Sequence, residues 1–298
     1  MADRLVILGL GFAGRAVARA AVAAGWTVAG TMRAPVAAAA MPGVELLAFD
    51  AAGPAIRQAT HLLVTAGPEA LGHDPVLAAH AAAVAAAPAL RWVGYLSTTG
   101  VYGDRGGGWV DEATPPAPGQ ERSRRRLAAE AEWRALAARR GLALDLFRTA
   151  GIYGPGRSAL DEVRAGRARR VDKPGHHFAR IHVEDIAAAV LAAAARPAAG
   201  ARVLHLADNE PAANAAVVAE AARLLGAPLP PLVPFETALA AMSPMGASFW
   251  AENRRVASRV TQAALGLAWR YPSYREGLAA ILATEEAAQG AAAEVAER

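Results

Sequence analysis

The chain has 298 residues, of which 54% are apolar and 19% are charged, as in an ordinary globular protein. Its net charge is +4, and because no basic run alternates with aromatic residues, we expect no nucleic-acid partner. There is no cysteine, which excludes disulfides, thiolate catalysis and cysteine-bound metals. The first predicted strand begins at Leu5 and no apolar run reaches about 18 residues, so we expect a cytoplasmic protein without a membrane partner.

The predicted elements begin with a strand, a glycine turn, a helix and a second strand. LVIL at 5–8 is a short apolar run typical of a buried parallel strand, helix-forming residues follow over 14–24, and TVAGT begins at Thr27. Further strands are predicted at 44–50, 61–67, 91–100 and 142–154. Strands that alternate with helical stretches predict a Rossmann-type α/β fold, with a doubly wound parallel sheet and a smaller C-terminal substrate lobe.

The composition changes after Gly154 and suggests two parts. Residues 155–180 are rich in loops and charges, whereas 181–210 return to a helix and a strand. We predict a dinucleotide-binding core over 1–154 that is completed by about 181–210. The substrate lobe and C-terminal helices are predicted at 155–180 and 211–298.

A glycine motif for a dinucleotide stands between the first strand and the first helix. Gly9, Gly11 and Gly14 fit G-x-G-x-x-G, and Phe12 and Ala13 lie between the last two glycines. In this pattern the first glycine permits a tight turn and the second lets the backbone approach a pyrophosphate. The third allows the helix to pack closely on the strand, and the helix N-terminus faces the phosphates.

The end of the second strand indicates which dinucleotide is bound. NAD sites usually carry an acid there, but this chain has Thr31, Met32 and Arg33. Because a guanidinium matches a phosphate, we favour NADP over NAD as the cofactor. Asp50 is predicted to accept a hydrogen bond from the adenine. The fourth strand ends at Thr65-Ala66-Gly67, where small residues let the chain pass close to the cofactor.

Three further motifs follow the glycine turn in order: YLSTTGVYGD, FRTAGIYGPGR and RIHVEDIAAAV. With them the chain resembles the short-chain dehydrogenase/reductase superfamily over roughly residues 4 to 280. It is most similar to the extended, NAD-dependent epimerase/dehydratase branch. The resemblance implies a Rossmann core and a substrate cleft over the nicotinamide, and a homodimer is an expectation at the level of the family only.

The resemblance also implies roles for single residues. Thr98, with Ser97 beside it, matches the hydroxyl that binds the reacting oxygen of the substrate. Arg148, Tyr153 and Gly154 match the motif of the sixth strand, where Tyr153 is expected to pack. His182 and Asp185 match a motif that mostly ties the second lobe to the core.

The catalytic Tyr-Lys pair of that family is absent. Alignment of the helix that ends at Glu130 puts Arg126 in the lysine slot and Arg122 in the tyrosine slot. No shift restores the pair, because no tyrosine lies between Tyr102 and Tyr153 and the only lysine is Lys173. Arg126 can hold a phosphate or ribose but cannot donate a proton near neutral pH.

Several groups remain as alternatives for the missing acid. They are Tyr102, Tyr153, Asp111 and Glu112, or hydride transfer with Thr98 and an ordered water alone. Arg122 and Arg126 share a helix face and either bind an anionic substrate or form a solvated basic face. His176 and His177 lack the spacing of a metal site, so no metal is predicted.

Three functions follow from these observations. The first is an NADP-preferring oxidoreductase that acts on a small carbonyl or sugar-like substrate. The second is a non-catalytic NADP-binding regulator that senses redox state, for which missing acid–base groups matter little. The third is a sugar-nucleotide epimerase with an unusual acid. A 4,6-dehydratase is disfavoured, because Thr99-Gly100 replaces the Asp-Glu pair that such enzymes carry after the catalytic threonine.

Overall fold

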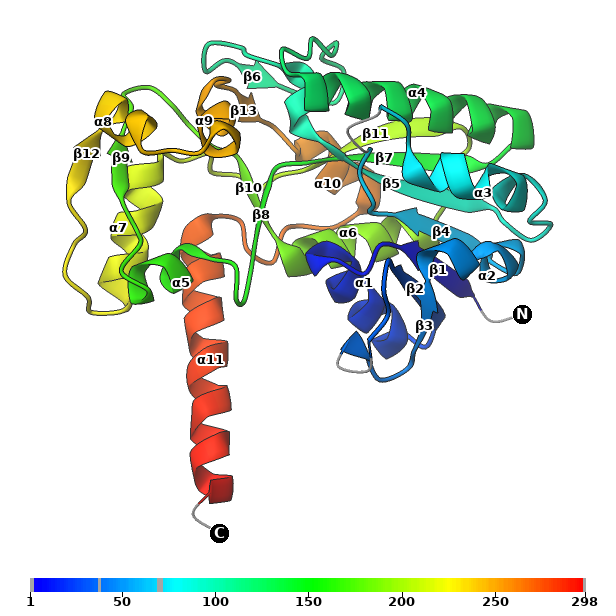
Figure 1. Cartoon of the computed structure of the whole chain (residues 1–298), viewed down its shortest axis with the longest axis horizontal. Helices are drawn as coiled ribbons and strands as arrows, with labels where there is room; N and C mark the ends of the chain where they lie inside the picture. Colours follow the sequence, from blue (N-terminus) through cyan, green and yellow to red (C-terminus); the bar gives the residue numbers. More distant parts are fainter. Residues whose placement is uncertain (1–2, 37–38, 69–71, 297–298) are drawn as a thin grey trace.

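A seven-stranded, all-parallel sheet forms the centre of the computed structural model, which describes residues 3–36, 39–68 and 72–296 (Figure 1). The strand order is β11-β7-β5-β4-β1-β2-β3. The strands are β1 (Arg4–Leu8), β2 (Thr27–Met32), β3 (Val44–Ala48), β4 (His61–Val64), β5 (Trp92–Thr98), β7 (Ala143–Thr149) and β11 (Ala201–Leu206). The predicted doubly wound Rossmann fold is confirmed.

Alternation along the strands explains why helices cover both faces of the sheet. In β1, Leu5 and Ile7 contribute to one apolar cluster, whereas Val6 and Leu8 contribute to another on the opposite face. The first cluster is covered by α1 (Phe12–Ala23) and α6 (Val183–Ala195). The second is covered by α2 (Gly53–Arg57), α3 (Pro75–Ala85) and α4 (Glu121–Arg140). Strands buried on both faces must be apolar throughout, as the sequence runs are.

Three predicted strands are shorter than their apolar runs. The run 44–50 ends as a strand at Ala48 and continues as the 3₁₀ turn η2 (Phe49–Ala51), which carries Asp50. The run 61–67 ends at Val64. The run 142–154 divides into β7 and β8 (Gly151–Tyr153), because β8 leaves the main sheet and pairs with β10 (Arg180–His182) instead.

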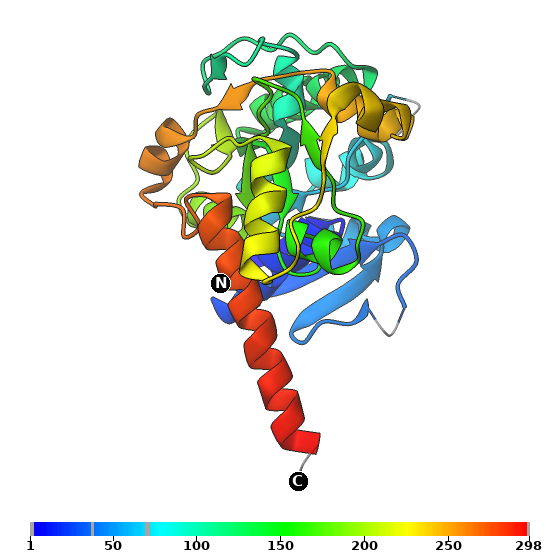
Figure 2. The ribbon, with the colours of Figure 1, turned by 90° about the vertical axis from the view of Figure 1, so that its left-hand side faces the viewer.

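The remaining elements are short strand pairs and helices outside the main sheet. Two more short strand pairs join distant segments: β9 (Arg170–Asp172) with β12 (Leu232–Pro234), and β6 (Trp109–Val110) with β13 (Arg255–Val256). The helices are α5 (Ala159–Arg164), α7 (Asn214–Leu224), α8 (Phe235–Ala240), α9 (Pro244–Trp250), α10 (Arg259–Leu265) and α11 (Tyr274–Ala296). The far end of α11 projects from the body (Figures 1 and 2).

The boundary between the two predicted parts is crossed by the chain more than once. Leu265 and Trp269, which the sequence assigns to the second part, belong to the apolar cluster under α1 and α6. The other cluster of this region, built around Tyr153, Leu160 and Leu278, joins α5, α7 and α11. The assignment of one part to the cofactor and the other to the substrate stays a prediction. No helix in the described ranges is long and apolar enough to span a membrane.

A buried ion pair holds α4 against the sheet. Arg148 of β7 pairs with Glu130 of α4 at 2.8 Å, and both side chains are at most 5% exposed. Glu130 also accepts the hydroxyl of Ser97 at 2.5 Å. Arg148 donates to the hydroxyl of Tyr102 at 2.9 Å, and that hydroxyl contacts His205 Nε2 at 2.5 Å. A buried charge network of this kind stabilises the fold only while every member keeps its partner.

We therefore expect Glu130→Ala to lower the free energy of unfolding by about 3–5 kcal/mol, because it leaves the Arg148 charge buried without its counterion. Glu121→Ala on the same helix removes a solvent-exposed partner of Arg124 and is expected to cost less than about 1 kcal/mol. Urea denaturation of both variants measures the difference. Equal losses for the two variants would contradict this account.

Candidate cofactor and substrate site

The glycine turn after β1 is held by threonines from the strands on either side. Gly9 has a φ of 114°, which disfavours any residue with a side chain. Thr31 Oγ1, at the end of β2, accepts the Gly9 N–H at 3.0 Å. Thr65 Oγ1, just beyond β4, donates to the Gly9 carbonyl at 2.5 Å. β1 lies between β2 and β4, where the chain order of the sheet reverses, the place where open α/β sheets bind ligands.

The other two glycines of the motif meet different surroundings. A Cβ atom on Gly14 would overlap the carbonyl oxygen of Gly9, so this glycine allows α1 to pack on the turn. A Cβ on Gly11 would meet no protein atom within 4 Å. Gly11 is also the N-cap of α1 and offers no side chain to the first-turn N–H groups, which include those of Phe12 and Ala13. This open, positively polarised helix end fits a pyrophosphate.

A pocket of about 760 Å³ lies over this turn. Its lining includes seven of the predicted cofactor residues: Gly9, Gly11, Thr31, Arg33, Asp50, Ala66 and Gly67. Leu10, Met32, Phe49 and Pro75 complete the lining and were not predicted. Thr65 and Gly14 lie behind the lining and contact Gly9 instead. The volume is within the usual range of small-molecule pockets.

Arg126, in the lysine slot, lies beside this pocket. Its Nη1 donates to the carbonyl of Leu96 in β5 at 2.5 Å, and its guanidinium lies 5.6 Å from the ring centre of Tyr95. A Cβ on Gly67 would overlap its Nη2, so Gly67 makes room for this side chain as well as for the pocket. The structure thus brings the end of β4, the end of β5 and α4 together around one permanent positive charge.

Thr98 opens into a second pocket of about 520 Å³. Its Oγ1 accepts the N–H of Gly100 at 3.1 Å, which leaves its own hydroxyl proton available to donate. The pocket is lined by Thr98, Thr99, Thr149, Ala150, Gly151, Ile152, Tyr153, His177, Phe178, Ala179, Arg180, Asn214, Gly246, Phe249, Trp250, Glu252, Arg254 and Val256. The sequence analysis singled out the end of β5, the Tyr153 motif, His177 and the motif that begins at Arg180, but not Asn214 or the residues from Gly246 to Val256.

Two predicted catalytic residues lie outside this pocket. The hydroxyl of Ser97 is committed to Glu130 in the buried ion-pair network. Tyr102 is fully buried, its hydroxyl also donates to the Asp111 carbonyl at 3.2 Å, and burial raises its pKa. Alternation along β5 turns Ser97 inward and leaves Thr98 at the strand end. The geometry therefore favours Thr98 over both.

The other candidate acids are already engaged in hydrogen bonds within the protein. The hydroxyl of Tyr153 donates to the Ser273 carbonyl at 3.3 Å, and burial raises its pKa far above the physiological range. Glu112 accepts from the backbone and hydroxyl of Thr261 at 3.0 and 2.6 Å. Asp111 accepts from Thr114 at 2.7 Å, and this bond holds its pKa below the usual range.

His182 and Asp185 connect α6 to the chain that follows α10. Asp185 accepts the backbone N–H groups of Arg270 and Tyr271 at 2.8 and 3.1 Å, and burial raises its pKa. The ring of His182 packs 4.1 Å from that of Tyr271, and burial lowers its pKa to about 4. These contacts agree with a structural role for the motif.

Arg122, in the tyrosine slot, reaches toward α9. Its guanidinium lies 4.2 Å from the ring centre of Phe249, which lines the Thr98 pocket, and 3.0 Å from the sulfur of Met245. The face shared by Arg122 and Arg126 is therefore not simply solvated. His176 is buried against Phe178 and Trp250, and its pKa is lowered by burial to about 4. Within the described residues no cluster of potential metal ligands occurs.

Comparisons with known proteins agree with this architecture. No family model matches the sequence. A 3-diazoavenalumate denitrifying reductase from a Streptomyces species is 31% identical over 185 residues, and the match spans 57% of this chain and 58% of that protein. A conserved protein of unknown function from Silicibacter pomeroyi DSS is 45% identical over 95% of this chain and 99% of its own, with a TM-score of 0.87.

A third similar protein is described as an NAD-dependent epimerase/dehydratase. It comes from Methylobacillus flagellatus and is 25% identical, with a TM-score of 0.69, over 96% of this chain and 100% of its own. A solved 4,6-dehydratase and a solved 4-epimerase with lower identity share the fold. The chain is a homologue of the Silicibacter pomeroyi protein, and it fits the extended epimerase/dehydratase-like branch of the short-chain dehydrogenase/reductase superfamily as an atypical member without the Tyr-Lys pair.

Proposed function

We propose that this protein is an NADP-preferring oxidoreductase that transfers hydride between the nicotinamide and a small carbonyl or sugar-like substrate. The observation that carries the proposal is the open surface at Gly11, beside a helix end without a side-chain cap. Arg33 lines the same pocket, and among the residues that line it Asp50 is the only acid. A guanidinium without an acidic neighbour on β2 suits a 2′-phosphate better than a free ribose hydroxyl.

The bound nicotinamide supplies the hydride in this proposal, and the side chains of the chain do the rest. Thr98 donates its hydroxyl proton to the substrate oxygen. Its oxygen accepts the N–H of Gly100, which leaves the proton free for this bond. Arg126 holds the cofactor end near β5 and adds positive charge there. In reduction the carbonyl carbon gains the hydride and its oxygen gains a proton. A water supplies that proton, because Tyr102 and Tyr153 are buried and bonded elsewhere.

The direction of the reaction is supported by one relative. The curated protein that matches over 58% of its length is a reductase, which favours a reductive role here. Structures of the same fold are described with NAD or with NADPH, so both cofactors suit the architecture. The Thr98 pocket, at about 520 Å³, suits a substrate of modest size.

A non-catalytic, NADP-binding regulator is the second candidate. The observation that favours it is the replacement of the usual acid by Arg122, which is engaged with Phe249 and Met245. A protein that binds NADPH tightly and reduces no carbonyl in a broad panel would fit this candidate. A sugar-nucleotide epimerase remains the third, and it requires a retained acid–base group that these contacts do not favour.

Gly11→Val tests the phosphate site without disturbing the fold. Gly11 has a φ of −77°, and an added Cβ meets no protein atom within 4 Å, so the melting temperature is expected to stay within about 2 °C. The NADPH dissociation constant is expected to rise at least tenfold, because the side chain fills the space of the pyrophosphate. Gly14→Ala is the contrast and should lower stability, since its Cβ overlaps the Gly9 carbonyl. Unchanged NADPH affinity in Gly11→Val would remove the basis of the proposal.

Arg33→Ala tests the cofactor preference. Loss of a charge-assisted bond to the 2′-phosphate is expected to weaken NADPH binding by roughly 10- to 100-fold and to leave NADH binding unchanged. Arg19→Ala removes an exposed charge from α1 and serves as the control. Titration of both variants with both cofactors measures the effect. A parallel loss of NADPH and NADH affinity would contradict a specific contact to the 2′-phosphate.

Thr98→Val tests the catalytic hydroxyl. The variant keeps the shape of the side chain but removes the donor, so kcat is expected to fall by about 100-fold while the NADPH dissociation constant stays within twofold. Thr98→Ser restores the donor and should recover most of the activity. If Thr98→Val and wild type turn over a carbonyl substrate equally, Thr98 has no part in the chemistry.

A further inference from the structure

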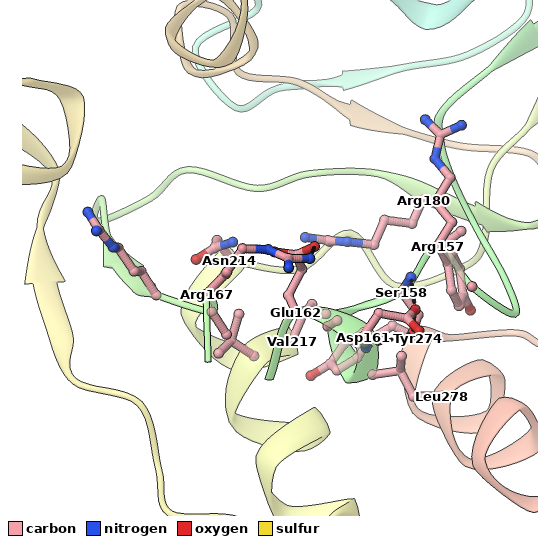
Figure 3. Close-up of a pocket in the computed structure, with 16 residues that line it drawn as sticks. Arg157, Ser158, Asp161, Glu162, Arg167, Arg180, Asn214, Val217, Tyr274 and Leu278 are labelled. Carbon is pink, nitrogen blue, oxygen red and sulfur yellow. Dashed lines mark hydrogen bonds and ion pairs between the residues drawn. The ribbon is translucent and has the colours of Figure 1, made fainter. Parts of the chain in front are cut away.

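We propose that a third pocket, next to that of Thr98, binds the phosphate or carboxylate group of an anionic substrate. We call it the arginine pocket. It has a volume of about 560 Å³ and is lined by Tyr153, Gly156, Arg157, Ser158, Ala159, Asp161, Glu162, Arg167, Ala168, Arg169, Arg180, Asn214, Val217, Val218, Tyr274 and Leu278 (Figure 3). The inference names the substrate class for the proposed reductase and rests on that function.

The charges of the arginine pocket do not cancel. Of its two acids, Asp161 accepts the backbone N–H and the hydroxyl of Ser158, both at 2.7 Å, in the cap of α5. Glu162 is bound by both guanidinium arms of Arg167 at 2.9 and 3.2 Å. Within the described part of the chain, Arg157 and Arg169 have no carboxylate in ion-pair range. Two uncompensated positive charges therefore remain at the rim.

Arg180 adds a third positive charge, deeper in the pocket. Its Nη1 donates to the carbonyls of Phe178 and Ala212 at 2.8 and 3.1 Å, and no carboxylate of the described residues lies in ion-pair range. The acid with the strongest electrostatic effect on Arg180 is Asp208, whose pKa is raised by burial to about 8, so at neutral pH it carries little of the charge that would offset Arg180. A guanidinium that is partly removed from water and has no ion-pair partner is costly, and an anionic ligand would relieve that cost.

The arginine pocket is continuous with the pocket of Thr98. Tyr153, Arg180 and Asn214 line both, so one ligand can occupy the two together. Val217 of α7 and Leu278 of α11 give the arginine pocket an apolar side opposite its arginines. A substrate could therefore place its acidic group in the arginine pocket and its carbonyl group at Thr98. The shared chemistry of phosphate and carboxylate is a compact group of anionic oxygens, which arginine binds through two parallel bonds.

Direct binding tests the pocket without turnover. Wild type saturated with NADP⁺, so that the phosphate positions of the cofactor are filled, is titrated with inorganic phosphate and separately with succinate. We expect saturable binding of at least one of them, and the two arms tell phosphate from carboxylate recognition. The double variant Arg157→Gln/Arg169→Gln should raise that dissociation constant at least tenfold. Arg139→Gln, which removes one positive charge in the last turn of α4, should leave it unchanged.

Turnover provides a second readout. Glyceraldehyde 3-phosphate is compared with glyceraldehyde, and succinic semialdehyde with butyraldehyde, as matched acidic and neutral carbonyls. The expected result is a lower KM for an acidic member, which the double variant raises at least tenfold while kcat stays within twofold. Equal KM values for both pairs, or neither anion binding to wild type, would overturn the anion site and leave the oxidoreductase proposal standing. Failure of NADP⁺ to bind would instead remove the proposed function.

Discussion

The conformation of Gly9 is the constraint on which the candidate site depends. Its backbone lies in a region that only glycine adopts easily, and two threonine hydroxyls fix both of its polar groups. Those threonines come from β2 and β4, so the two neighbours of β1 hold the turn from both sides. This glycine turn also sets where α1 begins, because Gly14 packs directly on the Gly9 carbonyl. The bare end of α1 is aimed into the pocket as a consequence.

The same arrangement explains how an arginine can occupy the slot of the usual lysine. Gly67 leaves room for the guanidinium of Arg126, and the Leu96 carbonyl at the end of β5 receives it. A guanidinium keeps its charge at any relevant pH, so it can hold a cofactor but cannot donate a proton near neutral pH. In the proposed function Arg126 therefore keeps the binding role of the lysine, whereas the acid of the pair is missing because Arg122 occupies the tyrosine slot.

Local patterns in the sequence predicted the fold and most of the residues that line the pocket over the glycine turn, because each depends on a few adjacent residues. The glycine turn, Arg33 and Asp50 all follow a strand end that the apolar runs mark. The substrate side was less accessible. Ser97 and Thr98 are neighbours with similar side chains, and only the parity of β5 tells which one faces the pocket. Asn214 and Phe249 come from segments whose approach depends on tertiary packing, and no local pattern marks them.

A crystal structure with NADPH tests the central claim most directly. The account predicts the pyrophosphate against the N–H groups at the start of α1, over Gly11, with the 2′-phosphate at Arg33 and the nicotinamide ring beside Thr98. A structure in which NADPH binds elsewhere, or in which saturating cofactor leaves the surface over Gly11 free, would contradict it.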